Sequence, residues 1–247
     1  MALIFQGLTF RYGRKTEVFS DFSARIESSS TVLLGPNGAG KSTLMALAAS
    51  HLTPADGTVT WNGIVSSSRR ERVRYRKAVA WIPQQITPTP GLTVREQVAY
   101  SGWLKGLSRA SAWEESAKAI ARVQLEKLAD RKSHQVSGGQ LRRMGIAGAL
   151  THQSELILMD EPTAGLDPTQ RSVFRSLIAE LGRSVSVVVS THQTEDLADL
   201  YQDVIVLAAG QTVFQGTTQE FHSLAGDVSS PRESAEAAYS ALVGREV

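Results

Sequence analysis

A glycine-rich segment near the start of the chain carries the residue types needed to bind phosphate groups. Residues 35–42 read GPNGAGKS, which satisfies the pattern GxxxxGK followed by Ser or Thr. Backbone amides in a glycine-rich turn and at a helix N-terminus present positive dipoles to an anion, and glycine lets the backbone approach phosphate oxygens closely. Lys41 offers a charge to the outer phosphates, and the Ser42 hydroxyl is placed to ligate Mg²⁺. The predicted nucleotide-binding residues here are Gly35, Pro36, Asn37, Gly38, Ala39, Gly40, Lys41, Ser42 and Thr43.

A pair of acidic residues supplies a second group suited to the same chemistry. LILMDE at 156–161 places Asp160 at the carboxyl end of an apolar run, where α/β sheets present ligand groups, and Asp160 can hold Mg²⁺ through water. Glu161 follows as the candidate to accept a proton from the attacking water. By itself, an acidic pair at a strand end is as typical of an ordinary cap as of a catalytic site. Downstream of a phosphate-binding loop, it indicates nucleotide hydrolysis.

These residues need elements that hold them together at one edge of a sheet. The run TVLLG at 31–35, the glycine-rich loop and the helix-favouring segment 42–50 give the order strand, loop, helix. Continuous apolar strands that alternate with helices imply a parallel sheet covered on both faces. Further strands of this kind are expected at 78–83, 156–160, 185–190 and 204–209.

The first part of the chain is typical of antiparallel β structure. Apolar residues at alternating spacing predict short paired strands, with turns near Gly7 and Gly13. GTVTWNG at 57–63 predicts a strand that ends in an Asn-Gly turn. The charge run RRERVRYRK at 69–77 is interpreted as the solvated face of a short helix. The alternating residues are Leu3, Phe5, Leu8, Phe10, Val18, Phe22, Ala24 and Ile26.

A helical block interrupts the β/α pattern. Thr93 with Glu96 predicts one capping box, and Ser111 with Glu114 predicts another. Because this block separates the β/α units on either side of it, we expect an inserted α-helical lobe at about 93–151. Apolar residues recur within it at helical spacing, namely Ala117, Ile120 and Val123.

The C-terminal segment predicts a helix of its own. Ser230, Pro231 and Glu233 provide a cap, a first-turn proline and a box partner. We expect this helix to pack on the domain, with docking to a partner as the alternative. The chain is therefore divided into a nucleotide-binding domain at 1–226, which includes the lobe, and a tail at 227–247. The apolar face of the tail helix comprises Ala235, Ala238, Tyr239, Leu242 and Val243.

Composition and charge narrow the class of protein. The 247 residues, 42% of them hydrophobic, are enough for one large α/β domain. The formal net charge of +2 gives no global field for wrapping nucleic acid, although a local basic surface stays open. The absence of cysteine excludes disulfides, cysteine-based zinc sites and thiol catalysis, and fits a reducing compartment. No signal peptide and no apolar run of roughly 18 residues are expected, so membrane work would fall to a partner.

The pentapeptide VSGGQ at 136–140, the signature segment, gives the chain its resemblance to a known family. It lies between the phosphate-binding loop and LILMDE, and it resembles the signature of ATP-binding cassette (ABC) ATPases, whose commonest form is LSGGQ. Val136 replaces the leucine, which keeps an apolar side chain. Ser137 and Gln140 predict a capping box at a helix start, and such an N-terminus binds anions. The resemblance assigns Ser137, Gly138, Gly139 and Gln140 to nucleotide binding.

The resemblance extends over nearly the whole chain. Tyr12, in FRYG, occupies the place of the adenine-stacking aromatic. Gln84, after WIP, matches the glutamine whose amide reaches Mg²⁺ and the attacking water. Asp167, in AGLD, matches the acidic member of a loop that crosses to the second subunit, and His192 matches the histidine that contacts the γ-phosphate. The other histidines, read as surface or helix residues, are His51, His134, His152 and His222.

The family assignment implies roles for these side chains and a fold around them. Catalysis is expected from Lys41, Gln84, Glu161 and His192, and Mg²⁺ binding from Ser42, Gln84 and Asp160. The implied fold is an α/β P-loop NTPase core with a mainly parallel sheet, an N-terminal antiparallel β subdomain and an inserted α-helical lobe. Two such domains would meet head to tail and sandwich ATP and Mg²⁺ between the phosphate-binding loop of one and the signature segment of the other.

The resemblance also implies partners and a location. We expect three features of its partners: a second ABC ATPase subunit that is a copy of this chain in a homodimer, a polytopic transmembrane permease, and no nucleic acid. The permease would dock near Gln84 and the segment QITPTPGL, which places the chain at the cytoplasmic face of the cell membrane. DEPTAGLDP together with STHQTEDL slightly favours export.

Three alternatives stay open. The first is an importer cassette. The second is a soluble ABC ATPase of DNA repair, translation or cluster assembly, which the lack of a long coiled-coil insertion and of a second cassette disfavours. The third is a regulatory nucleotide sensor without turnover, which intact Glu161 and His192 disfavour.

Overall fold

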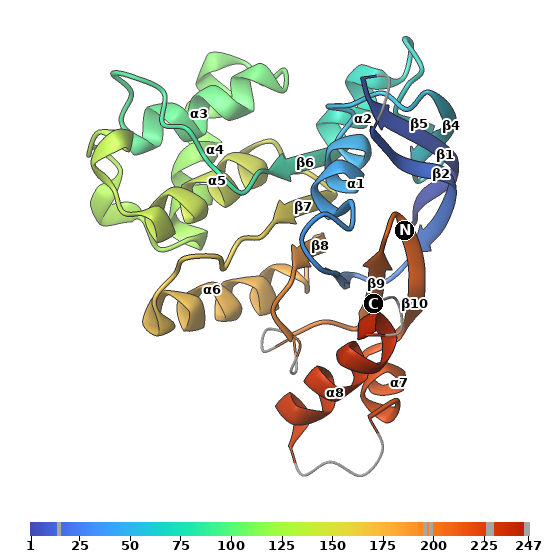
Figure 1. Ribbon diagram of the computed structural model, residues 1–247. Coiled ribbons are helices and arrows are strands. Elements are labelled where there is room, and N and C mark those ends of the chain that lie inside the picture. The colour runs from blue at the N-terminus through green and yellow to red at the C-terminus, as the bar shows by residue number, and fades with distance from the viewer. Residues whose placement is uncertain (14–15, 195–196, 198–199, 226–229, 245–247) are drawn as a thin grey trace.

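The chain folds into two sheets with helices around them, as the computed structural model in Figure 1 shows. The structure describes residues 1–13, 16–194, 197, 200–225 and 230–244. Within these ranges, none of the helices has the length and apolar character needed to cross a bilayer. The expected fold class is confirmed, because a parallel core sheet, an antiparallel N-terminal sheet and a separate helical lobe are all present.

The first sheet is antiparallel and has the strand order β2-β1-β4-β5. Gly7 was expected in a turn, but it lies inside a continuous strand β1, where the register against β2 shifts and Gly7 takes a φ of +58°. The Asn-Gly turn is confirmed, since Asn62 and Gly63 have φ of +48° and +79° and connect β4 to β5. The strands are β1 (Leu3–Tyr12), β2 (Thr16–Ile26), β4 (Asp56–Trp61) and β5 (Ile64–Val65).

The second sheet has the order β10-β9-β3-β8-β7-β6. Its strands are parallel except β10, which pairs antiparallel with β9 at one edge. The four later strands predicted from apolar runs are all present. Strand β10 was not predicted, because QTVFQGT is half exposed and has no continuous apolar run. The strands are β3 (Ser30–Leu34), β6 (Val79–Ile82), β7 (Leu156–Asp160), β8 (Ser186–Thr191), β9 (Asp203–Ala208) and β10 (Gln211–Thr217).

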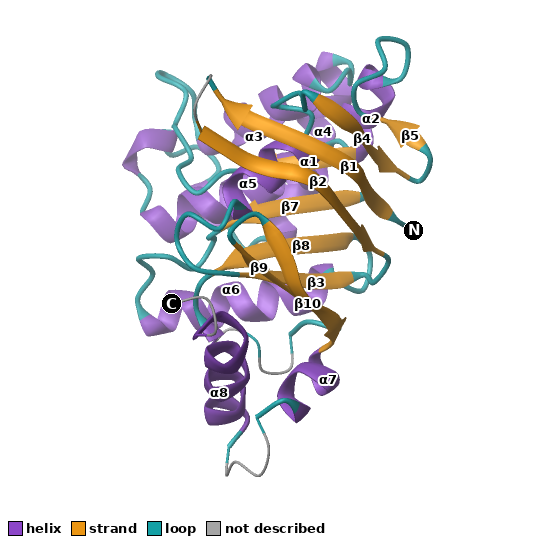
Figure 2. Ribbon diagram, turned by 45° about the vertical axis from the view of Figure 1, so that its right-hand side comes forward, coloured by secondary structure: helices purple, strands orange, loops and turns teal. Residues whose placement is uncertain are grey.

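Successive residues of the parallel strands point into two different cores, as the pleat of a strand requires. Val32 and Ile157 face one core, which also receives residues from helices α4 (Arg109–Arg122), α5 (Gly138–Thr151), α6 (Pro168–Leu181) and α8 (Pro231–Val243). Leu33 and Leu158 face the other, which lies between the two sheets and around helix α1 (Lys41–Ala48). Figure 2 shows the antiparallel sheet crossing above the parallel one. The phosphate-binding segment therefore begins from a strand that is buried on both faces.

Three helices form the lobe between β6 and β7, and Figure 1 shows them to one side of the core. The capping box of Thr93 with Glu96 is confirmed. The second predicted box is wrong, because the helix begins earlier: its cap is Ser108, whose side chain accepts from the Ser111 amide. Ala117 is exposed, so the buried face of this helix differs from the predicted one. The lobe contains α3 (Val94–Leu104), α4 (Arg109–Arg122), η1 (Glu126–Leu128), η2 (Ser133–Gln135) and α5 (Gly138–Thr151).

The remaining helices cover the core sheet. In the charge run, helix α2 buries Tyr75 while Arg74 and Lys77 are exposed, in agreement with the solvated face that was expected. The tail helix buries Ala235 and Ala238 and packs on α7 and β10. Residues 227–229 and 245–247 of the predicted tail lie outside the described ranges. These helices are α2 (Arg72–Ala78), α6 (Pro168–Leu181), α7 (Thr218–Ser223) and α8 (Pro231–Val243).

Candidate functional site

Four neighbouring strands of the parallel sheet end at the same edge and bring most of the predicted site residues there. β3 leads into residues 35–42, here called the phosphate loop, β8 leads into His192, β7 ends in Asp160, and β6 leads towards Gln84. The strands lie side by side in the order β3-β8-β7-β6 and are parallel, so their carboxyl ends coincide. A cleft of about 420 Å³ at this edge is lined by Tyr12, Gln84, Glu161, His192 and the phosphate loop.

The backbone of the phosphate loop depends on glycine. Gly40, the cap of helix α1, has a φ of +104°, and Gly38 has a φ of +87°. At Gly35, a Cβ atom would stand 2.2 Å from the carbonyl oxygen of Leu207, so no side chain fits there. The loop then passes directly into α1, whose first residues line the cleft, and the first amides of a helix have no partner within it. This arrangement is suited to an anion.

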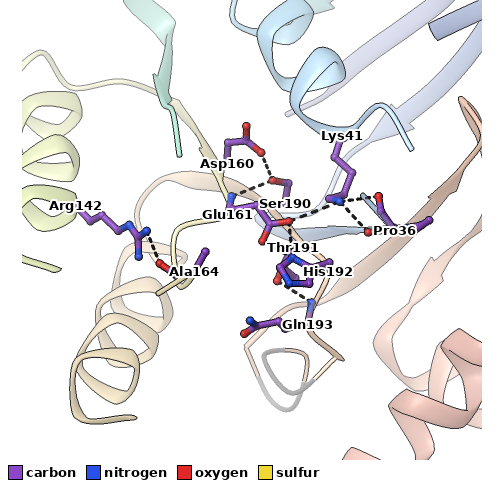
Figure 3. Close-up of polar contacts among 11 residues, drawn as sticks. Pro36, Lys41, Arg142, Asp160, Glu161, Ala164, Ser190, Thr191, His192 and Gln193 are labelled. Carbon is purple, nitrogen blue, oxygen red and sulfur yellow. Dashed lines mark hydrogen bonds and ion pairs between the residues drawn. The ribbon is translucent and has the colours of Figure 1, made fainter. Parts of the chain in front are cut away.

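Lys41 is buried and makes its contacts within the site. Its Nζ donates to the carbonyl oxygens of Gly35 and Pro36 at 2.8 and 3.0 Å, and it lies 3.6 Å from a carboxylate oxygen of Glu161. Burial lowers the pKa of Lys41, while the carboxylates of Glu161 and Asp160 oppose that shift. The Lys41 amino group thus lies between the loop carbonyl oxygens and the Glu161 carboxylate (Figure 3).

A serine that the sequence did not single out holds the two acidic residues in place. Ser190 Oγ donates to Asp160 Oδ1 at 2.5 Å, and it accepts from the Glu161 amide at 3.1 Å. Glu161 takes a left-handed φ of +46°, an uncommon conformation for a side chain of its size. The same amide also donates to the Ser190 carbonyl oxygen at 3.1 Å. Strand β8 therefore fixes the turn that aims Glu161 into the cleft.

Glu161 and His192 contact each other directly. The Nδ1 atom of His192 lies 3.0 and 2.9 Å from the two carboxylate oxygens of Glu161. Glu161 is almost fully buried, whereas the His192 ring is largely exposed. A carboxylate that orients an imidazole is an arrangement suited to moving or holding a proton near a reacting oxygen.

The cleft is open on the side of Tyr12. Its ring is exposed and packs edge-on against Phe10, with centroids 4.9 Å apart, and its hydroxyl lies 3.3 Å from Thr43 Oγ1. An exposed aromatic face beside a phosphate site is available for stacking on a flat ring. Gln84 is also exposed and lines the same cleft.

The signature segment and Asp167 are not part of this cleft. The predicted capping box of Ser137 with Gln140 is confirmed, and it begins helix α5 in the lobe. Asp167 caps α6, where its side chain accepts from the Gln170 amide at 2.8 Å. Neither segment lines the cleft around the phosphate loop, so the structure divides the predicted residues into two separate groups.

The residues at the strand edge fit a hard divalent cation. Ser42, Asp160 and Gln84 offer hydroxyl, carboxylate and amide oxygens, which are the ligands that Mg²⁺ prefers. In the part of the chain that the structure describes, no group of three or more His, Cys, Asp or Glu side chains could hold a metal. A magnesium ion here would therefore depend on water and on nucleotide oxygens for most of its ligands.

Two residues near the site were missed from the sequence. Ser190 stands two positions before His192, and the side-by-side arrangement of β7 and β8 makes it a partner of Asp160. Tyr239 of the tail helix is the second: it does not line the cleft, but burial raises its pKa and the charge of Glu161 adds to the shift. No local pattern links Ser190 to Asp160 or Tyr239 to Glu161, because the members of each pair are far apart in sequence.

A family model described as ABC transporter matches residues 20–164, more than half of the chain. The energy-coupling factor transporter ATP-binding protein EcfA2 of Lactiplantibacillus plantarum is 37% identical over 89% of this chain and 79% of its own length. The linearmycin resistance ATP-binding protein LnrL of Bacillus subtilis is 34% identical over 87% of this chain and 70% of its own. The cobalt import ATP-binding protein CbiO of Rhodobacter capsulatus is 34% identical over 85% and 77%.

A solved structure has the same fold. It is a dimeric ATP-binding cassette in a post-hydrolysis state bound to ADP and Pi. Its TM-score to this chain is 0.76 at 25% identity, and the match covers 87% of this chain and 98% of the other.

Proposed function

Because this chain belongs to the ABC transporter family as an ATP-binding ATPase subunit, we propose that it drives transport through a separate membrane-spanning protein. The observation that carries the proposal is the meeting of the phosphate loop, the acidic pair and His192 at one edge of the parallel sheet. Each group comes from a different strand end, and together they supply phosphate binding, charge and a base.

Each side chain at the edge has a proposed task in hydrolysis. Lys41 and the loop amides hold the outer phosphates, and Tyr12 stacks on the adenine ring. Ser42, Gln84 and Asp160 would hold Mg²⁺, which would neutralise charge on the phosphate oxygens. Glu161 takes the proton of the attacking water, and His192, held by Glu161 at 2.9 Å, contacts the γ-phosphate.

The separation of the signature segment from the cleft supports a two-chain site. We assign Ser137, Gly138, Gly139 and Gln140 to the nucleotide held by a second subunit, and Asp167 to the contact between the two chains. The start of α5 is exposed at Ser137 and Gly138, so it is accessible to a partner. A γ-phosphate between two helix N-termini would stabilise the pair, so pairing should depend on ATP.

We propose import as the direction of transport. The slight preference for export drawn from the sequence is not favoured by these relatives, because one of them is named for cobalt import. The relative named for linearmycin resistance keeps export as the alternative. We also propose a permease partner and a position at the cytoplasmic face of the membrane. The proposed domain division is a nucleotide-binding domain at 1–226 and a tail at 227–247.

Replacement of Lys41 by alanine tests the nucleotide site. Lys41→Ala removes the buried cation beside Glu161, so we expect ATP affinity measured by calorimetry to fall by at least ~10-fold, the worth of a strong charged hydrogen bond. Lys127→Ala, which changes an exposed lysine in the lobe, is the matched control and should bind ATP like the parent. Equal ATP affinity in Lys41→Ala and the parent would contradict the assignment of the phosphate loop.

A further inference from the structure

An arginine of helix α5 holds the loop that follows the acidic pair. Arg142 Nη2 donates to the Ala164 carbonyl oxygen at 2.5 Å, and this contact joins the lobe to the loop between β7 and α6 (Figure 3). The side chain is partly buried, and burial lowers its pKa. Its Nη1 atom is buried and has no hydrogen-bond partner among the described residues. The contact with the Ala164 carbonyl oxygen is therefore the hydrogen bond through which the guanidinium group acts on the loop.

The same loop is packed against α5 at a second point. A Cβ atom on Gly139 would stand 2.8 Å from Gln170 Oε1 and 3.4 Å from Leu166 Cδ2. The absence of a side chain at Gly139 thus lets the start of α5 approach the end of the loop and the first turn of α6. Two contacts from one helix, three residues apart on the same face, fix the loop along its length.

The loop begins at Glu161, so its path is linked to the direction of that side chain. The Ala164 amide donates to the Glu161 carbonyl oxygen at 3.2 Å, which makes a tight turn between the carboxylate and the arginine contact. Glu161 already has a left-handed φ of +46°, and such a conformation persists only where the surroundings hold it. Ser190 holds the turn from the strand side, and Arg142 holds it from the lobe side.

We propose that Arg142 is a positioning residue that couples the signature segment to Glu161 through the carbonyl oxygen of Ala164. The proposal rests on the proposed function, in which the signature segment contacts the nucleotide of the second chain and Glu161 acts on the nucleotide of its own chain. Arg142 follows the signature segment by two residues, so a movement of α5 on pairing is passed to the loop that carries the base. Arg142 does not line the cleft around the phosphate loop.

Steady-state ATPase kinetics of Arg142→Ala, Arg142→Gln and the parent test this role. Arg142→Ala frees the loop, so we expect kcat to fall by roughly 10- to 100-fold, the usual effect of misplacing a catalytic group by about 1 Å. The ATP dissociation constant, measured by calorimetry, should stay within twofold of the parent, because the phosphate loop is unchanged. Arg142→Gln keeps one N–H donor and should recover a substantial part of kcat.

Arg143→Ala is the matched control. Arg143 lies on the same helix and is also partly buried, but it donates to the carbonyl oxygens of Val123 and Gln124 inside the lobe. We expect its Tm to fall at least as much as that of Arg142→Ala, with kcat close to the parent. The proposal is overturned if Arg142→Ala keeps the parent kcat, or if Arg143→Ala loses as much kcat as Arg142→Ala does. A parent chain without ATPase activity would instead refute the proposed function.

Discussion

At the scale of single residues, the site depends on the short distances between its ionisable side chains. Lys41, Glu161 and His192 form a continuous set of contacts, with the Glu161 carboxylate between the lysine and the histidine ring. The Glu161 carboxylate oxygens lie in the cleft beside Lys41 and His192, where a carboxylate can accept a proton from water. The geometry is therefore that of a base held ready for a water molecule.

Replacement of Glu161 by glutamine should separate binding from turnover. Glu161→Gln keeps the shape of the side chain and removes its ability to take a proton, so we expect ATP binding to persist while kcat falls by about 10² to 10⁴. Phosphate release and equilibrium ATP binding are the two measurements. A variant that hydrolyses ATP as fast as the parent would show that the base is another group.

The sequence predicted the site residues best where those that act together are close together along the chain. The phosphate loop depends on glycines and a lysine within eight positions, and this spacing alone predicted the site. Ser190 was missed because its partners, Asp160 and the Glu161 amide, are 30 and 29 residues away and meet it only when β7 pairs with β8. A hydrogen bond between neighbouring strands leaves no signature along the chain.

At the scale of elements, the lobe is joined to the core by polar contacts at helix ends. Lys105, which follows α3, donates to the carbonyl oxygens of Arg76 and Val79, and His152, which follows α5, lies 3.2 Å from the Lys77 carbonyl oxygen. These carbonyl groups end helix α2, where free oxygens and a negative dipole favour donors. Burial, followed by the charge of Arg76, lowers the pKa of Lys105 to about 8.

Because of these contacts between the lobe and the core, we expect the stability of the chain to fall at acidic pH. Burial, followed by the charge of Lys105, lowers the pKa of His152 from 6.5 to about 4. The folded state thus prefers the neutral ring, so its contribution to stability is complete above pH 6.5 and is lost as the pH falls towards 4. We expect a loss of roughly 1–3 kcal/mol from this group, measured as the free energy of unfolding in urea at pH 7.5 and 4.5.

Two glutamine variants separate this effect from general acid unfolding. His152→Gln keeps a donor for the Lys77 carbonyl oxygen and has no proton to gain, so it should lose less stability at low pH than the parent. His134→Gln changes an exposed histidine of the lobe and should behave like the parent. An equal loss in all three chains would rule out His152 as the sensitive group.

The elements themselves were predictable where a pattern was strong. Apolar runs predicted β3, β7, β8 and β9, because a strand buried on both faces has no polar side. Strand β10 has exposed and half-exposed residues throughout, so periodicity could not identify it. The start of α4 was placed too late because Ser108 and Ser111 are both acceptable caps, and the choice depends on where the preceding turn ends.

At the scale of the whole molecule, one chain carries two separate groups of predicted nucleotide-binding residues. The phosphate loop belongs to the core and the signature segment to the lobe, and only the first lines the cleft. The resemblance implied this division, because the signature segment of the family acts on the nucleotide of another subunit. No composition or periodicity of this sequence would have predicted it.

Pairing of two chains should require both ATP and an intact signature segment. With hydrolysis blocked by Glu161→Gln, Mg-ATP should convert the 26.7 kDa chain into a species of twice that mass, measured by light scattering. Adding Gly138→Asp puts a negative charge where we propose that a second nucleotide lies, so pairing should be lost while ATP binding to the single chain remains.

The fold has room for this change, since a Cβ atom on Gly138 meets nothing within 4 Å. Ala117→Asp, on an exposed position of α4, adds the same charge elsewhere and should leave pairing intact. Loss of pairing in both double variants would mean that charge alone, rather than its position, opposes association.

The contacts of Lys41 with the Gly35 and Pro36 carbonyl oxygens have a consequence for the speed of the cycle. An incoming phosphate must replace these two oxygens as the hydrogen-bond partner of Lys41. The free energy of nucleotide binding is therefore smaller than the new hydrogen bonds alone would give, because the old ones are lost. On product departure, the ammonium group can return to the carbonyl oxygens and is never left as a bare cation in a desolvated place. We expect the contacts of Lys41 with the loop to lower the affinity for the nucleotide, and to stabilise the site after product release by the same free energy.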